Sequence, residues 1–223
     1  MHTTITERVV LVGGPRISDG QDCLVYALDL GELVLIDCGA GPSWPRIREN
    51  VERAGMAPAD LHTLVLTHCH IDHIGAAAAV VSETGCRVVA HRLDAEAIES
   101  GDPIRTASSW YGLDLDPVEV TEKVDGEELT IAFSAGDLRL IHTPGHTPGS
   151  LVGVVDDAGE RVLFGQDIHG PFSHEFGSDL EAWRRSMTRV LELEADILCE
   201  GHYGVFRPAD AVRGFIEGQL ASH

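Results

Sequence analysis

Apolar residues occur along the chain in short blocks, most of them the length of a β-strand. Three such blocks come first, at 8–14, 22–30 and 32–39, each bounded by glycine or charged residues. The turn "DLGE" between the second and the third predicts a hairpin. A fourth block, 61–68, predicts a buried strand.

Helical spacing separates several of these strands. Residues 43–55 end in glycine, with Ser43 expected to cap the helix and Pro45 in its first turn. Further helices are expected at 74–85, 92–101, 179–195 and 207–222. The segment 179–195 is expected to be the longest amphipathic helix.

The remaining apolar blocks complete the pattern. They predict strands at 86–91, 127–133, 137–142, 150–156, 161–165 and 196–201. The stretch 101–128 is less regular, and its part 101–117 is expected to be a polar loop with an aromatic pair. Strand-rich halves, each followed by helices, indicate an α/β (α+β) chain in which two sheets pack together with helices outside. We find no repeat or linker, and expect 1–223 to form a single domain.

Composition narrows the classes of partner. With 36 acidic and 16 basic residues the formal net charge is −20, which disfavours nucleic acid and anionic membranes. No apolar run approaches the roughly 18 residues of a membrane span, and the start lacks the pattern of a secretory signal. The five cysteines are odd in number and widely spaced, which favours reduced thiols. We therefore expect a cytoplasmic protein.

The segment "THCHIDH", 67–73, follows the strand at 61–68 and is dense in metal-ligand side chains. His68 and His70, two residues apart, can hold one ion, whereas Asp72 and His73 are displaced along the expected loop toward a second. Imidazole nitrogen and carboxylate oxygen suit zinc, manganese or iron better than calcium or magnesium. A polar turn with locally bonded histidines is the alternative. Cys69 is expected to point into the core.

Three further strand ends offer more ligands. "HTPGHTPGS", 142–150, holds His146 between two Thr-Pro-Gly turns, and His142 is expected to be structural. "QDIHG" offers Asp167, with His169 a weaker candidate, and "GHYG" offers His202. Four such strand ends together favour a metal centre over surface roles.

The motifs "THCHIDH", "HTPGHTPGS", "FGQD" and "EGHYG", in this order, resemble those of the metallo-β-lactamase-fold hydrolase superfamily. The upstream "LIDCGA" is similar to its first motif, and the resemblance covers residues about 10 to 210. The ligand set is similar to that of glyoxalase II. The resemblance implies a four-layer αββα sandwich.

The resemblance also implies a division of the ligands. His68, His70 and His146 would bind the first metal, and Asp72, His73 and His202 the second, with Asp167 bridging both. Asp37 would orient a loop or a ligand from behind the site. Gln166 departs from the family, which commonly has glycine before the bridging aspartate.

Two divalent ions, most favourably zinc with iron or manganese as alternatives, lower the pKa of a bridging water and supply hydroxide near neutrality. We therefore expect hydrolysis of an ester, thioester, lactone or similar bond in a small molecule. Asp72 is a candidate to orient the nucleophile or accept its proton.

Several other kinds of enzyme in this superfamily fit the chain to different degrees. A sulfur dioxygenase with one iron remains an alternative, as does an enzyme like the acyl-homoserine lactonases, with Tyr111 or Tyr203 contacting substrate. Asp167 disfavours a true β-lactamase. The negative net charge disfavours a transfer RNA processing enzyme. The small number of basic residues near the C-terminus disfavours recognition of glutathione.

Substrate choice is expected to lie in two loops that could overhang the metals, in the stretches 101–117 and 169–179. Trp110, Tyr111, Phe172 and Phe176 would line an apolar cleft there, with simple packing as the alternative. His169 and His174 are candidates to protonate a leaving group. The sequence leaves the oligomeric state open.

Overall fold

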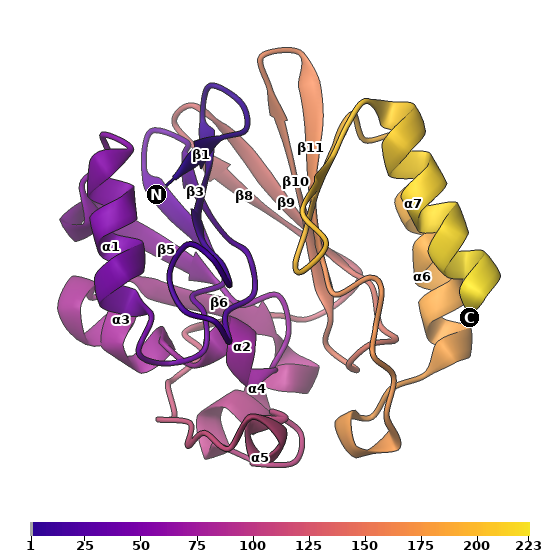
Figure 1. Cartoon of the computed structure of the whole chain (residues 1–223), viewed down its shortest axis with the longest axis horizontal. Coiled ribbons are helices and arrows are strands. Elements are labelled where there is room, and N and C mark those ends of the chain that lie inside the picture. The colour runs from indigo at the N-terminus through magenta and orange to yellow at the C-terminus, as the bar shows by residue number, and fades with distance from the viewer. Residues whose placement is uncertain (1) are drawn as a thin grey trace.

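The computed structural model describes residues 2–223, and its strands form two sheets that face each other (Figure 1). The first sheet has seven strands in chain order: β1 (Thr3–Thr4), β2 (Val9–Gly13), β3 (Val25–Asp29), β4 (Leu33–Ile36), β5 (Leu61–Val65), β6 (Arg87–His91) and β7 (Glu122–Val124). The second has six, in the order β13 (Val205–Phe206), β12 (Ile197–Glu200), β11 (Glu160–Gln166), β10 (Leu151–Asp157), β9 (Gly136–His142) and β8 (Glu128–Phe133). The predicted hairpin β3–β4 is an antiparallel pair, and so is β10–β11.

Helices cover the outer faces of both sheets (Figure 1). On the first sheet lie α1 (Trp44–Arg53), α3 (Ala77–Thr84) and α4 (Arg92–Ser100), and on the second α6 (Leu180–Leu191) and α7 (Ala209–Ser222). Short turns connect them: η1 (Pro58–Asp60), α2 (Ile71–Ile74), α5 (Ser108–Tyr111) and η2 (His174–Phe176).

Three apolar clusters hold these layers together. The central cluster packs the inner faces of the sheets, where Tyr26 meets Phe164 edge-on at 5.6 Å between ring centroids. The second joins the first sheet to its helices around Trp44, and the third joins the second sheet to α6 and α7 around Trp183. The predicted αββα sandwich is therefore confirmed.

The sheet topology brings the predicted ligand segments together. Strands β4, β5 and β6 are parallel neighbours in one sheet, and β11 and β12 are parallel neighbours in the other. Parallel strands end at the same edge of their sheet, and the ligand clusters show that the segment after β5 meets the segments after β11 and β12 across the sandwich. The segment after β9 approaches them, since Leu151 N donates to Thr67 O at 2.8 Å.

Some elements differ from the prediction. The helix expected at 74–85 is two, α2 and α3, so Asp72 and His73 lie on a helical turn and not in a loop. Gly75 follows α2 and packs against the backbone of Ala40. A Cβ atom at this position would lie 2.6 Å from the carbonyl carbon of Ala40, so only glycine fits between α2 and α3. The stretch 101–128 contains α5 and β7, whose four and three residues are too short to show a period.

Two helix details were also wrong. Helix α6 ends at Leu191, so α7, with 14 residues against 12, is the longer. Ser43 precedes α1 but makes no capping hydrogen bond, because its backbone is helical and not extended as a cap requires; its hydroxyl donates to Asp22. Across residues 2–223 there is no helix with the length and apolar character that crossing a membrane requires.

Candidate metal centre

The first cluster combines side chains from three strand ends. His68 and His70 follow β5, His146 follows β9, and Asp167 follows β11. All four are buried, and each offers one ligand atom within 4.8 Å of the others. His146 Nε2 lies 2.9 Å from His70 Nδ1. Asp167 Oδ2 lies 3.5 Å from His146 Nε2 and 3.9 Å from His68 Nε2.

A second cluster lies beside the first. Asp72 and His73 come from α2, and His202 from the loop between β12 and β13. Asp72 Oδ2 lies 3.2 Å from His202 Nε2 and 3.5 Å from His73 Nε2. The helical turn therefore directs Asp72 and His73 to a different position from the one that His68 and His70 share.

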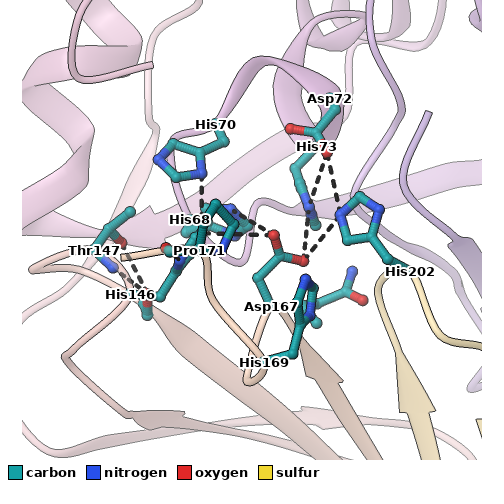
Figure 2. A network of polar contacts seen from close by, with 12 residues as sticks. His68, His70, Asp72, His73, His146, Thr147, Asp167, His169, Pro171 and His202 are labelled. Atoms are coloured by element: carbon teal, nitrogen blue, oxygen red, sulfur yellow. Dashed lines mark hydrogen bonds and ion pairs between the residues drawn. The ribbon is translucent and has the colours of Figure 1, made fainter. Parts of the chain in front are cut away.

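Asp167 lies between the two clusters and presents one carboxylate oxygen to each (Figure 2). Its Oδ2 faces the first cluster, whereas its Oδ1 lies 3.2 Å from Nε2 of both His73 and His202. Glycine is required nearby, because a Cβ atom at Gly201 would lie 2.6 Å from Asp167 Oδ1. The seven predicted ligand residues are thus brought to one place.

The donor atoms fit metal ions. Among the described residues, His68 Nε2, His73 Nε2 and Asp167 Oδ1 are buried without a hydrogen-bond partner. Leaving such groups unsatisfied costs about 1–3 kcal/mol each, so they are normally paired or coordinated. Imidazole nitrogens and carboxylate oxygens are the ligands that zinc and similar cations take.

The histidines of the first cluster are in the neutral form that can bind a cation. Burial, helped by the neighbouring histidines, lowers the pKa of His68 and of His70 well below the usual value. Burial likewise lowers the pKa of His146 to about 4. All three imidazoles are therefore neutral near pH 7 and keep a lone pair for a metal ion.

The second cluster holds opposite charges. Burial works against the charged forms, but His73 and His202 hold the pKa of the Asp167 carboxyl well below its usual range, and that of Asp72 is also lowered. In turn, burial would lower the pKa of His202, but the Asp167 and Asp72 carboxylates raise it to about 10. A cation that binds here displaces protons from these imidazoles.

Asp37 supports the second cluster from behind. It is fully buried, and its Oδ2 lies 2.7 Å from His73 Nδ1. The backbone and hydroxyl of Thr67 each donate to this carboxylate at 2.8 Å, and the Gln166 amide donates to it as well. Asp37 thus lies where the sequence predicted, and it fixes the orientation of the His73 ring.

Asp94, in α4, is a supporting residue that sequence reasoning missed. It is fully buried and accepts hydrogen bonds from Cys69 N at 3.1 Å, from Thr147 Oγ1 at 2.6 Å and from Gly149 N at 2.8 Å. It therefore ties the segment of His68 and His70 to the segment of His146. No sequence signal marks it, because it lies in an ordinary helix.

Glu200 was also missed. Its Oε2 accepts from the backbone N–H groups of His202 at 2.7 Å and Tyr203 at 2.8 Å, which fixes the loop that carries His202. Its Oε1 lies 2.5 Å from His169 Nδ1. A signal did exist, since Glu200 is an acidic residue that closes the apolar strand "DILCE".

The other candidates lie in different places. The His142 ring stacks on His91 at 3.8 Å and lies outside both clusters, as predicted. His174 and Tyr203 are exposed. Cys69 is buried, as expected. All five cysteines are free.

A cleft opens beside the clusters, and part of its lining was predicted. Trp110, Tyr111 and Phe176 line it together with His169. Burial and the Asp72 carboxylate raise the pKa of the Tyr111 phenol. Phe172 does not line this cleft, and for it the alternative of simple packing holds, because its ring packs against Trp183 with centroids 5.2 Å apart.

An αββα sandwich with two His/Asp clusters on either side of one aspartate, Asp167, is characteristic of a metal-binding class of protein. The family model described as the metallo-beta-lactamase superfamily matches residues 18–202, and the chain belongs to this superfamily. The match begins before Asp37 and ends at His202, so it encloses both clusters.

Individual proteins agree with this membership. The chain is 31% identical over 118 residues to a probable metallo-hydrolase of Methanocaldococcus jannaschii, covering 53% of this chain and 55% of that protein. It is 28% identical over 198 residues to the probable metallo-hydrolase YflN of Bacillus subtilis, covering 76% of this chain and 74% of that one. The chain thus spans about half the length of the M. jannaschii relative.

Solved structures share the fold. A metallo-beta-lactamase of Cronobacter sakazakii with a HARLDQ motif superposes with a TM-score of 0.85 at 23% identity, covering 99% of this chain and 92% of that one. At this identity the likeness establishes the architecture alone.

Proposed function

We propose that this chain is a metal-dependent hydrolase with two divalent metal ions, most favourably zinc. The observation that carries the proposal is the position of Asp167, whose two oxygens face two separate groups of ligands. The first ion would be held by His68, His70 and His146, and the second by Asp72, His73 and His202, with Asp167 as the bridge.

The hydrogen bonds of two ligands support this division. His146 Nδ1 donates to the Pro171 carbonyl at 2.7 Å, so Nε2, on the cluster side, is the nitrogen that carries the lone pair. His73 Nδ1 is bonded to Asp37, which leaves its Nε2 facing Asp72 and Asp167. Such partners fix the ring tautomer and strengthen the ligand.

The bound ions would supply a water of lowered pKa and a Lewis acid for the attacked group. Asp72 lies at the edge of the cleft and is placed to orient the nucleophile and to accept its proton. Tyr111 lies beside Asp72 and is placed to donate a hydrogen bond to the substrate. The reaction would be hydrolysis of an ester, thioester, lactone or similar bond in a small molecule.

Both metallo-hydrolase relatives support the hydrolase class. The complete second cluster favours a dinuclear hydrolase over a sulfur dioxygenase with a single iron. Among hydrolysable bonds a lactone stays a candidate, with Tyr111 rather than the 64% exposed Tyr203 as the contacting tyrosine. A net charge of −20 supports a small-molecule substrate over nucleic acid.

A panel of esters, thioesters and lactones tests the proposal. The zinc-loaded protein should hydrolyse at least one class, and a chelator should abolish this activity. His70→Ala should lose metal and fall to the uncatalysed rate while keeping its circular dichroism spectrum, because His70 lies outside the three apolar clusters that hold the layers together.

His142→Ala is the matched control, since this histidine lies outside both clusters, and it should retain most of its activity. Full activity in His70→Ala would refute the site. Oxygen consumption with a persulfide, together with one iron per chain, would instead support the dioxygenase.

A further inference from the structure

The cleft beside the clusters has two unlike walls. Its volume is about 220 Å³, and one wall is polar, with His70, Asp72, Asp167 and His202. The rest of the lining contains two aromatic rings, Trp110 and Phe176, and further apolar surface from Ala107 and Pro171. A substrate whose scissile bond lies at the polar wall must place another part of itself against the aromatic one.

The two rings come from different loops and touch each other. Trp110 lies on α5 and Phe176 on η2, with centroids 4.6 Å apart. Phe176 is 1% exposed and meets the His70 ring edge-on at 4.4 Å, so the aromatic wall begins at the metal cluster itself.

A hydrogen bond ties the two loops together. Trp110 Nε1 donates to Glu175 Oε2 at 3.2 Å, across 65 positions of sequence. The bond holds the indole edge toward η2. We call Trp110, Glu175 and Phe176 the aromatic clasp.

Core packing does not account for Trp110. The indole is 57% exposed, whereas the other two tryptophans, Trp44 and Trp183, are 3% and 1% exposed. A large ring left half in water at the rim of a cleft gains free energy when an apolar ligand covers it.

The charges of the cleft restrict what can bind there. Among the described residues that line it there is no lysine or arginine, and beside its aromatic wall the Glu175 carboxylate adds negative charge. Nothing on the aromatic wall would pair with a carboxylate or phosphate at the far end of the substrate. A neutral group is therefore preferred.

We propose that the aromatic clasp binds an apolar acyl or aryl group of a neutral ester or thioester and so determines substrate choice. The proposal rests on the hydrolase function proposed above. The exposed Trp110 ring supplies apolar contact area, Phe176 packs behind it, and the Glu175 hydrogen bond holds the indole in place before the substrate arrives.

Hydrolysis of p-nitrophenyl acetate, butyrate and hexanoate by the zinc-loaded protein tests the clasp. In the wild type, kcat/KM should rise by about twofold per methylene, less than the roughly fourfold of full burial because the wall is half open. In Trp110→Ala the hexanoate-to-acetate ratio should fall about tenfold. Trp110→Phe should restore most of that ratio, since it keeps an apolar ring.

Ile104→Ala is the matched control. Ile104 lies in the same loop and is 54% exposed, but it does not line the cleft. The hexanoate-to-acetate ratio of kcat/KM in Ile104→Ala should equal that of the wild type. An unchanged ratio in Trp110→Ala would overturn the proposal.

A binding measurement separates the clasp from catalysis. Hexanamide, a neutral analogue that is not an ester, should shift the fluorescence of the exposed Trp110 saturably in the zinc-loaded protein, whereas acetamide should not. The shift should vanish in Trp110→Ala.

If hexanamide binds but no substrate is cleaved, the hydrolase proposal fails and the clasp stands. If esters are cleaved without dependence on acyl length and hexanamide does not bind, the clasp fails and the hydrolase stands.

Discussion

At the scale of single residues, two positions next to the ligands have a strained backbone conformation. Asp37 and Gln166 have φ values of 59° and 42°, in the left-handed region that favours glycine. The Gln166 amide donates to Asp37, which in turn holds His73. The sequence showed that Gln166 replaces the usual glycine, but not that its side chain joins the support of a ligand.

The stacked pair of His91 and His142 leads to a prediction on pH. Burial and the neighbouring His142 lower the pKa of His91 from 6.5 to about 4. Between these values the unfolded chain binds more protons than the folded one, so acidification through this window destabilises the fold. The effect on the free energy of unfolding is on the order of 1–2 kcal/mol.

His91→Asn tests this with little change to the helix end. His91 Nδ1 accepts from Leu93 N at the start of α4, and asparagine offers an equivalent acceptor. In chelator-treated protein, denaturant unfolding at pH 7 and pH 4.5 should show a smaller acid-induced loss for the variant. An equal loss in both proteins would contradict the prediction.

At the scale of elements, strands were predicted more completely than the turns between them. The apolar runs of β5, β9, β11 and β12 marked where ligands would follow. The four-residue helix α2 is too short to show a helical period. That Asp72 and His73 point to a different metal position from His68 and His70 was therefore inferred only from their later place in the motif. Long-range ties such as that of Asp94 require the fold to be known.

Asp94→Asn should weaken metal binding at the first cluster. The amide keeps one acceptor oxygen but turns an N–H group toward donors that now lack an acceptor. We expect about a tenfold rise in the zinc Kd, at the lower end of the effect of losing such a partner. A competition titration against a chromophoric chelator measures it.

Glu96→Gln is the control, since it removes an exposed carboxylate from the same helix. It should bind zinc as the wild type does. If Asp94→Asn also bound zinc with wild-type affinity, the tie between the two ligand segments would not matter for the site.

At the scale of the whole molecule, the architecture followed from the resemblance of four motifs and not from periodicity. Periodicity predicted two packed sheets with outer helices, which many folds share. The structure adds the reason why ligands 134 positions apart, such as His68 and His202, can serve one centre: the two sheets face each other, and their ligand-bearing strands end at the same rim.

The central claim is that two metal ions lie on opposite sides of the Asp167 carboxylate. An anomalous difference map from crystals grown with zinc tests it most directly. We predict two peaks, about 3.5–4 Å apart, one among His68, His70 and His146 and one among Asp72, His73 and His202. A single peak at the first cluster, with none beside Asp72, would contradict the account.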